Sequence, residues 1–368
     1  MAECEAMTAS HEDDQLAFFE TLSLGFARAG SLTGVLEQDY RIAGCKLRLC
    51  FAGPALIPAI VPALAHLECP VSGKPDLTIE IFDSKSTGAP LPFPAARFVD
   101  LLRLRWWEYL DNRREIKGLN GERIRSVFHL GPDILSLLDT HRDRAVYWVE
   151  DGAMIPYYEK GYPLSFLLNW WLARRGRYFV HAAAIGLQEG GILLTGKGGS
   201  GKSTTTLACV ESELGICGDD YTAIEPARAV AHSLYNTVKL KSLRDVERFP
   251  ALKGCVSNLD RVGEGENGEK AMIFLHEHHP HKLLEQMPVR AILVPRIADS
   301  PETRIVPASA ALAFKALAPS TLFQLPGNAH KAFRALVEMV RRIPAYEIAL
   351  GSDIPRIPAI IRQFIQSI

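Results

Sequence analysis

The amino-acid sequence predicts an α/β protein in two parts, a smaller α+β module over residues 1–155 and an α/β domain over residues 156–368. Three observations lead to this prediction. The chain has 368 residues, which is enough for about two domains. Its first half contains short segments in which apolar and polar residues alternate. Its second half contains short apolar segments flanked by glycines and followed by helical patterns.

The composition excludes several classes of protein. The 41 Lys and Arg residues nearly balance the 42 Asp and Glu residues, so the chain lacks the strong basic charge of many nucleic-acid-binding proteins. No apolar run approaches the roughly 18 residues of a membrane span, and the acidic N-terminal start is unlike a secretory signal. The seven cysteines form no Cys-x-x-Cys pair. We therefore expect a soluble, cytoplasmic protein with reduced thiols that binds neither nucleic acid nor a membrane.

The first half reads as a set of short strands. Alternation predicts half-buried strands over residues 45–51, 77–82 and 123–128, and residues 145–149 form a further expected strand. None of these segments carries a recognisable group of catalytic or metal-ligating side chains. The sequence therefore predicts this module without assigning it a role.

The second half opens with a helix and two strands. The helix is expected over residues 163–175, with Pro163 in its first turn and Gly176 at its end. Residues 178–180 and 192–195 are predicted as buried parallel strands, because they are short apolar runs between glycines.

A glycine-rich loop separates the second of these strands from a helix. This helix is expected from Lys202 to about residue 214, with Gly215 at its end, and residues 216–218 then lead through Asp219 and Asp220 into another strand. Two strands and three helices complete the prediction, over residues 289–294 and 346–350 and over residues 309–317, 329–342 and 354–366.

The loop carries the clearest chemical motif. Its residues match the phosphate-binding pattern G-x-x-x-x-G-K-[ST] at every defined position: Gly196, Lys197, Gly198, Gly199, Ser200, Gly201, Lys202 and Ser203. In this pattern, backbone N–H groups at a helix N-terminus surround phosphate oxygens. We expect this loop and the following Thr204 to bind ATP, with Lys202 at the β- and γ-phosphates and Ser203 on Mg²⁺.

Three other interpretations of the loop stay open. It could be a glycine-rich turn without function. Gly196, Gly198 and Gly201 also satisfy the dinucleotide-binding fingerprint, although that fingerprint needs no Lys-Ser step. Finally, Lys197 together with Lys202 resembles the deviant Walker loop of partition-type and iron–sulfur-carrier ATPases, in which the first lysine acts across a dimer.

Two adjacent carboxylates follow the loop helix. Phosphoryl transfer needs a base that takes the proton of the hydroxyl group receiving the phosphate. A second carboxylate can help to bind the metal ion. Asp219 and Asp220 come at the end of the strand after the loop helix, and such a strand end lies beside the phosphate loop in a doubly wound sheet. His181 lies at the end of an earlier apolar run. We treat all three as candidate active-site residues.

These motifs together resemble the HPr kinase/phosphorylase superfamily, whose fold is shared with phosphoenolpyruvate carboxykinase. The resemblance rests on four segments in order: His181-Ala-Ala-Ala, Gly191-Ile-Leu-Leu-Thr-Gly, Lys197-Gly-Gly-Ser-Gly-Lys-Ser and Gly218-Asp-Asp. It covers about residues 178–350. It implies a P-loop kinase domain in which Lys202 binds phosphates, Ser203 and Asp219 serve the metal, Asp220 is the base and His181 belongs to the active site.

The resemblance also indicates a class of substrate. The second signature of HPr kinases has no match around residues 239–247, so the chain is closer to the related serine kinases that lack it. These relatives imply an acceptor serine or other hydroxyl on a peptide or protein, and possible assembly into homo-oligomers. Two further functions stay open, namely a regulatory ATPase without a dedicated acceptor and a nucleotide-binding pseudo-kinase.

Other residues have weaker claims. The histidine-rich residues 276–281 suggest either a metal site or, preferably, an exposed loop or acceptor-binding edge. Lys239 and Lys241 should share one face of a strand, which is either solvated or turned toward phosphates. The tryptophan pairs at 106–107 and 170–171 are expected in a core or an interface.

Overall fold

The computed structural model describes residues 12–70, 72–263, 268–324 and 329–368. The acidic N-terminal start lies outside these residues. The described chain forms two compact units. Unit 1 runs to Val61 and continues over Glu68–Arg174, while unit 2 comprises Pro62–Leu67, Arg175–Gln324 and the final residues 329–368. The domain boundary expected between residues 155 and 156 stays a prediction; the change from unit 1 to unit 2 comes after Arg174.

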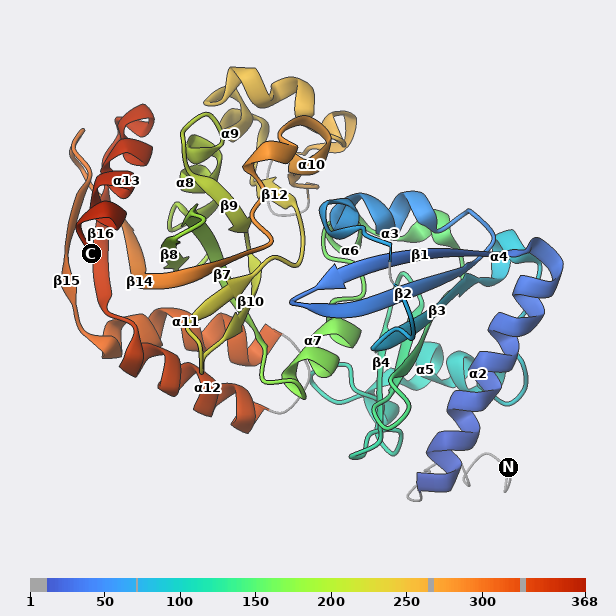
Figure 1. Ribbon diagram of the computed structural model, residues 1–368. Helices are drawn as coiled ribbons and strands as arrows, with labels where there is room; N and C mark the ends of the chain where they lie inside the picture. The colour runs from blue at the N-terminus through green and yellow to red at the C-terminus, as the bar shows by residue number, and fades with distance from the viewer. Residues whose placement is uncertain (1–11, 71, 264–267, 325–328) are drawn as a thin grey trace. The chain divides into compact units, whose positions relative to one another are not determined.

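Unit 1 contains one six-stranded sheet in the order β1-β2-β3-β6-β5-β4 (Figure 1). Strands β2, β3 and β6 are parallel to one another, and the remaining pairs are antiparallel. The strands are β1 (Val35–Ile42), β2 (Cys45–Ala52), β3 (Leu77–Asp83), β4 (Ile124–His129), β5 (Ile134–Asp139) and β6 (Arg144–Val149). Strands β2, β3 and β4 confirm the three strands predicted from alternation, and β6 confirms the further strand expected at residues 145–149.

The helices of unit 1 cover this sheet. They are α2 (Glu12–Thr33), α4 (Ser84–Thr87), α5 (Ala95–Tyr109), α6 (Tyr157–Gly161) and α7 (Ser165–Ala173), with the 3₁₀ turn η2 (Gly152–Met154). Phe18 of α2 and Phe98 of α5 pack edge to face with ring centroids 5.6 Å apart, and both join a core that includes Phe82 and Trp148 of the sheet. Helix α3 (Ile57–Leu64) and the turn η1 (Ala65–Leu67) contain the Pro62–Leu67 segment that belongs to unit 2.

Unit 2 is built around an eight-stranded sheet of mixed direction. Its order is β11-β10-β7-β8-β14-β16-β15, and β9 also pairs with β7. The strands are β7 (Tyr178–Leu187), β8 (Gly190–Thr195), β9 (Gly215–Gly218), β10 (Tyr221–Glu225), β11 (Val230–His232), β14 (Gln286–Ile297), β15 (Arg304–Ala308) and β16 (Ala345–Leu350). Strands β8, β14 and β16 are parallel, so unit 2 is a mixed α/β fold with parallel strands.

The expectation of a parallel strand at residues 178–180 was wrong. Strand β7 is ten residues long and antiparallel to β8. Only two residues separate these strands, and a parallel connection needs a crossover of about a dozen residues or more. Because both strands are buried, their composition resembles that of a parallel strand.

Helices cover both faces of the unit 2 sheet. They are α8 (Lys202–Val210), α9 (Leu243–Glu247), α10 (Leu275–His278), α11 (Ala310–Gln324), α12 (Ala329–Arg342) and α13 (Ile357–Ser367), with 3₁₀ turns η3 (Pro250–Cys255), η4 (Leu259–Arg261), η5 (Pro280–Lys282) and η6 (Ile354–Arg356). Unit 2 has a hydrophobic core on each face of this sheet, and successive residues of β7 belong to the two cores in turn. Ala182 and Ala184 join the core under α11 and α12, whereas Ala183 and Ile185 join the core under α8 and α13.

Helix α8 is covered on its outer side as well. There Leu207 and Val210 pack against Val238 and Ile273, which belong to the two-stranded sheet of β12 (Thr237–Leu240) and β13 (Ala271–Phe274). The helix ends at Val210, earlier than predicted, because Ser212 closes a turn by donating a hydrogen bond from Oγ to Cys209 O. Consequently Gly215 begins β9 instead of ending a helix.

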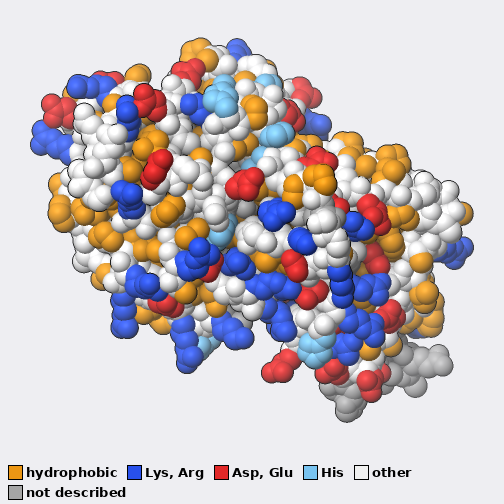
Figure 2. All heavy atoms as spheres, viewed as in Figure 1, with side chains coloured by type: hydrophobic (Ala, Val, Ile, Leu, Met, Phe, Trp, Pro, Cys, Tyr) orange, Lys and Arg blue, Asp and Glu red, His pale blue; other side chains and the backbone are white. Residues whose placement is uncertain are grey.

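Charged side chains of both signs are interspersed on the face shown in Figure 2, in keeping with the nearly balanced composition. No helix among the described residues combines the length and apolarity needed to cross a membrane.

Candidate functional site

The phosphate-loop motif joins a buried strand to a helix, as the pattern requires. Strand β8 is buried along its whole length and ends at Thr195, and α8 begins at Lys202. A Cβ atom on Gly196 would lie 2.8 Å from Ser200 Oγ. Gly201 has a φ of +100°, and a Cβ atom there would lie 2.5 Å from Leu350 Cδ1. Position 201 therefore requires glycine because of its positive φ, whereas a side chain at Gly196 would displace the Ser200 hydroxyl.

The Lys202 side chain lies inside the loop. It is 5% exposed, and its ammonium group donates a hydrogen bond of 2.8 Å to Gly196 O. Burial lowers the pKa of Lys202, and the negative charges of Asp220 and Asp219 oppose this shift. Lys197, by contrast, is exposed, as are Gly198 and Gly199 at the tip of the loop. The two lysines of the motif thus have different environments.

Strand register brings the two carboxylates to the same end of the sheet as the loop. Strand β7 lies between β8 on one side and β9 with β10 on the other. Its Ala182 is opposite Thr195 at the end of β8, and its His181 is opposite Tyr221 at the start of β10. Asp219 and Asp220 connect β9 to β10 and so lie at the same end of the sheet as the loop. Measured across the strands, their backbone is about two strand spacings, or roughly 10 Å, from the end of β8.

The side chain of Asp219 reaches the phosphate-loop helix α8. The residue is 1% exposed, and Thr206 Oγ1 of α8 donates a hydrogen bond of 3.1 Å to its Oδ1. A further side-chain hydrogen bond connects it to Ser203. Burial, followed by the charge of Asp220, raises the pKa of Asp219 to about 7. One of the two acids is therefore anchored directly to the phosphate-loop helix.

Asp220 faces a different environment. Its backbone adopts the left-handed conformation with a φ of +59°, which interrupts the strand between β9 and β10. Its side chain is 20% exposed, and its Oδ1 lies 3.4 Å from His181 Nε2. Strained backbone of this kind is concentrated at functional sites. The left-handed residue thus turns one carboxylate into the protein and leaves its neighbour accessible.

His181 does not lie at a strand end, as the sequence suggested, but within β7. The strand continues past it because Ala182–Leu187 pair with β8. The backbone N–H of His181 donates a hydrogen bond of 3.2 Å to Thr321 Oγ1, and its ring lies 5.9 Å from that of Tyr221. The imidazole is therefore held by a central strand of the sheet.

The donor set fits one Mg²⁺ ion. Asp219 Oδ2 is buried and has no hydrogen-bond partner among the described residues, although Oδ1 is bonded. It lies with Ser203 on the loop side of the site. Mg²⁺ prefers such oxygen ligands and usually takes one or two from the protein, the others coming from water and phosphate. Within the described residues no group of three or more His, Cys, Asp and Glu side chains suits a metal ion.

Two residues of this site, Thr206 and Lys270, lie outside the motifs that the sequence offers. Thr206 was not selected, although it lies three positions after Ser203 and such residues share a helix face. Lys270, next to β13, was also not selected; its positive charge acts on Lys202 and lowers the pKa of that lysine. Helical periodicity could have found Thr206. No local pattern relates Lys270 to the loop, because the pairing of β12 with β13 brings it there.

The other candidate residues agree only in part with what the sequence predicted for them. Lys239 lies in β12 and is buried, so the prediction of a solvated strand face was wrong for it, whereas Lys241 lies beyond the strand and is exposed. The histidine-rich segment forms the short helices α10 and η5 and is not a loop. Trp170 and Trp171 are buried, whereas Trp106 and Trp107 are about half exposed.

Comparisons with known proteins add little. No protein-family model matches the chain, and no curated protein matches it. Among solved structures, the HPr(Ser) kinase/phosphatase from Coxiella burnetii is similar at 12% sequence identity, over 51% of this chain and 94% of that chain, with a TM-score of 0.27. A similarity of this size carries no argument about function, which must be inferred from the site itself.

Proposed function

We propose that unit 2 is an ATP-dependent kinase of the HPr kinase/phosphoenolpyruvate carboxykinase-like type, which transfers the γ-phosphoryl group to a serine or other hydroxyl of a peptide or protein. One observation carries the proposal. A complete phosphate loop lies beside two acids, of which Asp219 is hydrogen-bonded to the helix that begins at Lys202 and Asp220 lies 3.4 Å from His181. A loop that only binds nucleotide needs no second, accessible carboxylate.

The loop would bind the triphosphate. Backbone N–H groups of residues 196–201 and the first turn of α8 provide donors for phosphate oxygens. When ATP binds, the Lys202 ammonium group would leave Gly196 O and donate to the β- and γ-phosphates instead. Its positive charge would there stabilise the γ-phosphoryl group during transfer. Mg²⁺, when bound through Ser203 and Asp219, neutralises phosphate charge.

Asp220 would act as the base. In the transfer, the acceptor oxygen forms a bond to the γ-phosphorus, the bond to the β–γ bridging oxygen breaks, ADP leaves and the hydroxyl proton passes to Asp220. Asp220 suits this role because it is more accessible than Asp219 and because the nearby His181 orients it. Asp219 suits the metal because it is buried against α8.

The proposal is tested by ATP turnover with and without a library of serine-containing peptides. We expect turnover that depends on the acceptor. Asp220→Asn should bind Mg·ATP normally in calorimetry but lose about 10²–10⁴-fold in turnover, the usual contribution of a general base. Binding without any turnover by the wild type would instead indicate a pseudo-kinase.

A regulatory ATPase is the alternative, and the exposed Lys197 is the observation that favours it, since an exposed lysine could act across a dimer. Steady ATP hydrolysis without acceptor that is abolished by Lys197→Ala would support this ATPase and contradict the kinase. If the kinase proposal holds, comparison of phosphorylated peptides from cells with wild type or Asp220→Ala identifies the acceptor.

A further inference from the structure

The exposed face of helix α12 carries a row of positive charge. Lys331, Arg334, Arg341 and Arg342 are exposed, and Lys and Arg side chains gather over this helix at the lower left of Figure 2. Glu338, the only acidic residue of the helix, lies between them and pairs with Arg342 at 3.3 Å. Because these positions recur every three or four residues, the four basic side chains form one continuous row, which we call the basic stripe. The opposite face of α12 is buried in the core of unit 2, through Ala335, Leu336, Met339 and Val340.

The turn between β10 and β11 extends the basic stripe. Arg342 Nη1 donates a hydrogen bond of 2.8 Å to Ala227 O, which brings the helix beside the neighbouring Arg228. The Arg228 side chain is 67% exposed. Its partner Glu225, at 3.7 Å, also lies 3.8 Å from Arg177, so one carboxylate serves two guanidinium groups. Positive charge therefore exceeds negative charge across this surface, although the whole chain has a formal net charge of only −1.

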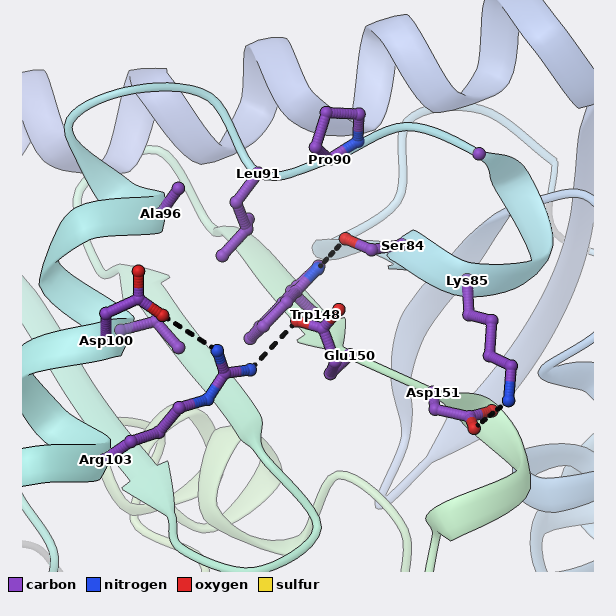
Figure 3. A pocket seen from close by; sticks show the side chains of 12 residues that line it. Ser84, Lys85, Pro90, Leu91, Ala96, Asp100, Arg103, Trp148, Glu150 and Asp151 are labelled. Carbon is purple, nitrogen blue, oxygen red and sulfur yellow. Dashed lines mark hydrogen bonds and ion pairs between the residues drawn. The ribbon is translucent and has the colours of Figure 1, made fainter.

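Two members of the basic stripe have no counter-ion. Arg334 and Arg341 form no ion pair within the part of the chain that the structure describes. Arg103 in unit 1 is the opposite case: beside a cavity of about 520 Å³, it pairs with Asp100 at 3.0 Å and with Glu150 at 2.9 Å (Figure 3). A guanidinium group has five N–H donors in a geometry that matches a carboxylate. The two unpaired arginines can thus receive carboxylates from a partner without breaking an ion pair of the chain.

The basic stripe lies on the pair of helices that borders the candidate site. Helix α12 packs against α11, with two ring centroids 5.3 Å apart in an edge-to-face contact. Near its end, α11 carries Thr321, whose Oγ1 accepts the hydrogen bond from the backbone N–H of His181. Burial, followed by the charge of Glu338, raises the pKa of Tyr178, which lies three residues before His181 in β7. A chain bound along the stripe can therefore extend toward His181 and Asp220.

The dimensions and composition of this surface favour a peptide. From Lys331 to Arg342 the helix rises by about 16 Å, which matches roughly five residues of an extended chain. Phe333 is 45% exposed beside the stripe and offers one apolar contact. A membrane would need the apolar face of α12, which is buried in the core. Single-stranded nucleic acid would need a series of exposed aromatic rings, whereas the described part of α12 exposes a single phenyl ring.

We propose that the basic stripe, together with Arg228, docks an acidic segment of the peptide or protein that receives the phosphoryl group. Arg334 and Arg341 donate to carboxylates of this segment, and an apolar side chain among them packs on Phe333. The negative charges of Asp220 and of the triphosphate keep the acidic segment out of the nucleotide site, so that the acceptor hydroxyl enters it alone. The inference rests on the proposed kinase function, which makes the docked partner the acceptor.

Fluorescence anisotropy with the full chain and without nucleotide tests the docking surface. The probe is a labelled heptapeptide of six Glu and Asp residues around one Phe, and its control carries Gln and Asn at the six positions. The acidic peptide should bind at least about tenfold more tightly, and a rise from 50 to 200 mM NaCl should weaken its binding by about threefold or more. Equal binding of the two peptides would overturn the proposal, as would tighter binding of a twelve-nucleotide oligothymidine.

Two matched double variants locate the surface. Arg334→Gln with Arg341→Gln should weaken binding of the acidic peptide about tenfold, because two unpaired guanidinium groups are lost. Arg296→Gln with Arg304→Gln removes the same charge from exposed positions of β14 and β15 and should change binding by less than about threefold. Equal weakening in the two double variants would show that only net charge matters and would contradict the assignment.

A non-hydrolysable ATP analogue with Mg²⁺ separates the basic stripe from the phosphate loop. Binding of the acidic peptide should persist when the loop is saturated with the analogue. Loss of binding would place the peptide in the loop and would contradict the docking surface.

Turnover separates failure of this inference from failure of the kinase proposal. With one serine added to each heptapeptide, the acidic substrate should have a KM at least about fivefold lower at a similar kcat, and the variant of Arg334 and Arg341 should lose this difference. Turnover without preference for the acidic substrate would contradict the docking surface. Binding of the acidic peptide without turnover of either substrate would contradict the kinase alone.

Discussion

Asp219 and Asp220 are neighbours in sequence, yet their side chains occupy different environments. The positive φ of Asp220 separates them, so that one carboxylate is buried against α8 and the other lies near His181. Environments that push the pKa values of paired carboxyl groups apart are a common way to assign them different roles. The conformation of this one residue therefore prepares the metal and base roles that we propose.

The raised pKa of Asp219 leads to a prediction about stability. Its folded-state value of about 7 exceeds its ordinary value of 3.8, so the folded state keeps a proton that the unfolded state loses between these pH values. The free energy of unfolding therefore decreases as pH rises from about 4 to about 7. Asp219→Asn removes this cost. Without nucleotide or Mg²⁺, the variant should melt a few degrees higher than wild type at pH 8 and equally at pH 4, as measured by circular dichroism. A lower melting temperature at pH 8 would contradict the raised pKa.

The two lysines of the loop provide a matched comparison. Lys202→Ala removes a buried ammonium group that lies inside the loop, so Mg·ATP turnover should fall by about 10²–10³-fold, the range seen when one stabilising donor is lost. Lys197→Ala removes an exposed side chain and should change turnover by less than about threefold if only Lys202 serves the phosphates. A steady-state coupled assay measures both. Equal losses in the two variants would show that Lys202 has no special role.

At the scale of elements, the loop between β8 and α8 depends on glycine at particular positions. Gly201→Ala should destabilise unit 2 by about 1–3 kcal/mol, because the new Cβ atom meets Leu350 and the residue has a positive φ. Gly198→Ala is the control, since a Cβ atom there meets no atom within 4 Å. Urea unfolding measures both. Equal stability of the two variants would contradict the close contact with Leu350.

His129 at the end of β4 makes the stability of unit 1 depend on pH. It is 3% exposed, its ring nitrogens have no hydrogen-bond partner among the described residues, and its ring packs on Phe166 at 4.6 Å. Burial lowers its pKa from 6.5 to about 3. As pH falls, His129 is therefore protonated at a higher pH in the unfolded state than in the folded state. The free energy of unfolding decreases progressively from about pH 6.5 toward pH 3.

Substitution of His129 should remove this dependence. Between pH 7 and pH 4.5, the free energy of unfolding should decrease less in His129→Phe than in wild type. The two decreases should differ by about 1–3 kcal/mol, because the variant lacks this protonation step. Urea titrations at both pH values measure the difference. An unchanged pH dependence would indicate that His129 is protonated as readily in the folded as in the unfolded state.

At the scale of the whole molecule, each unit has its own sheet and its own apolar core. Hydrogen exchange with and without Mg²⁺ and a non-hydrolysable ATP analogue should therefore show protection over residues 196–206 and 216–222 and no change over β1–β6. Protection follows from ordering of the loop and its neighbouring strands by the ligand. Protection confined to unit 1 would contradict the assignment of the nucleotide site.

Much of the architecture could be predicted from sequence because it depends on local patterns. Alternation predicted three strands of unit 1, a fourth was expected at residues 145–149, and the helix expected at residues 329–342 has the bounds of α12. The loop motif located the junction of β8 and α8 because its glycines and its Lys-Ser step are adjacent in the chain.

The sequence by itself determined four strands of unit 1, the bounds of α12 and the strand–loop–helix order around the phosphate loop, since these features follow from residues close together in the chain. Only the tertiary structure decided the antiparallel direction of β7, the contact of Thr206 with Asp219, the pairing of His181 with Asp220 and the cavity of unit 1. These features depend on the register between strands that are distant in sequence, and no local pattern specifies that register.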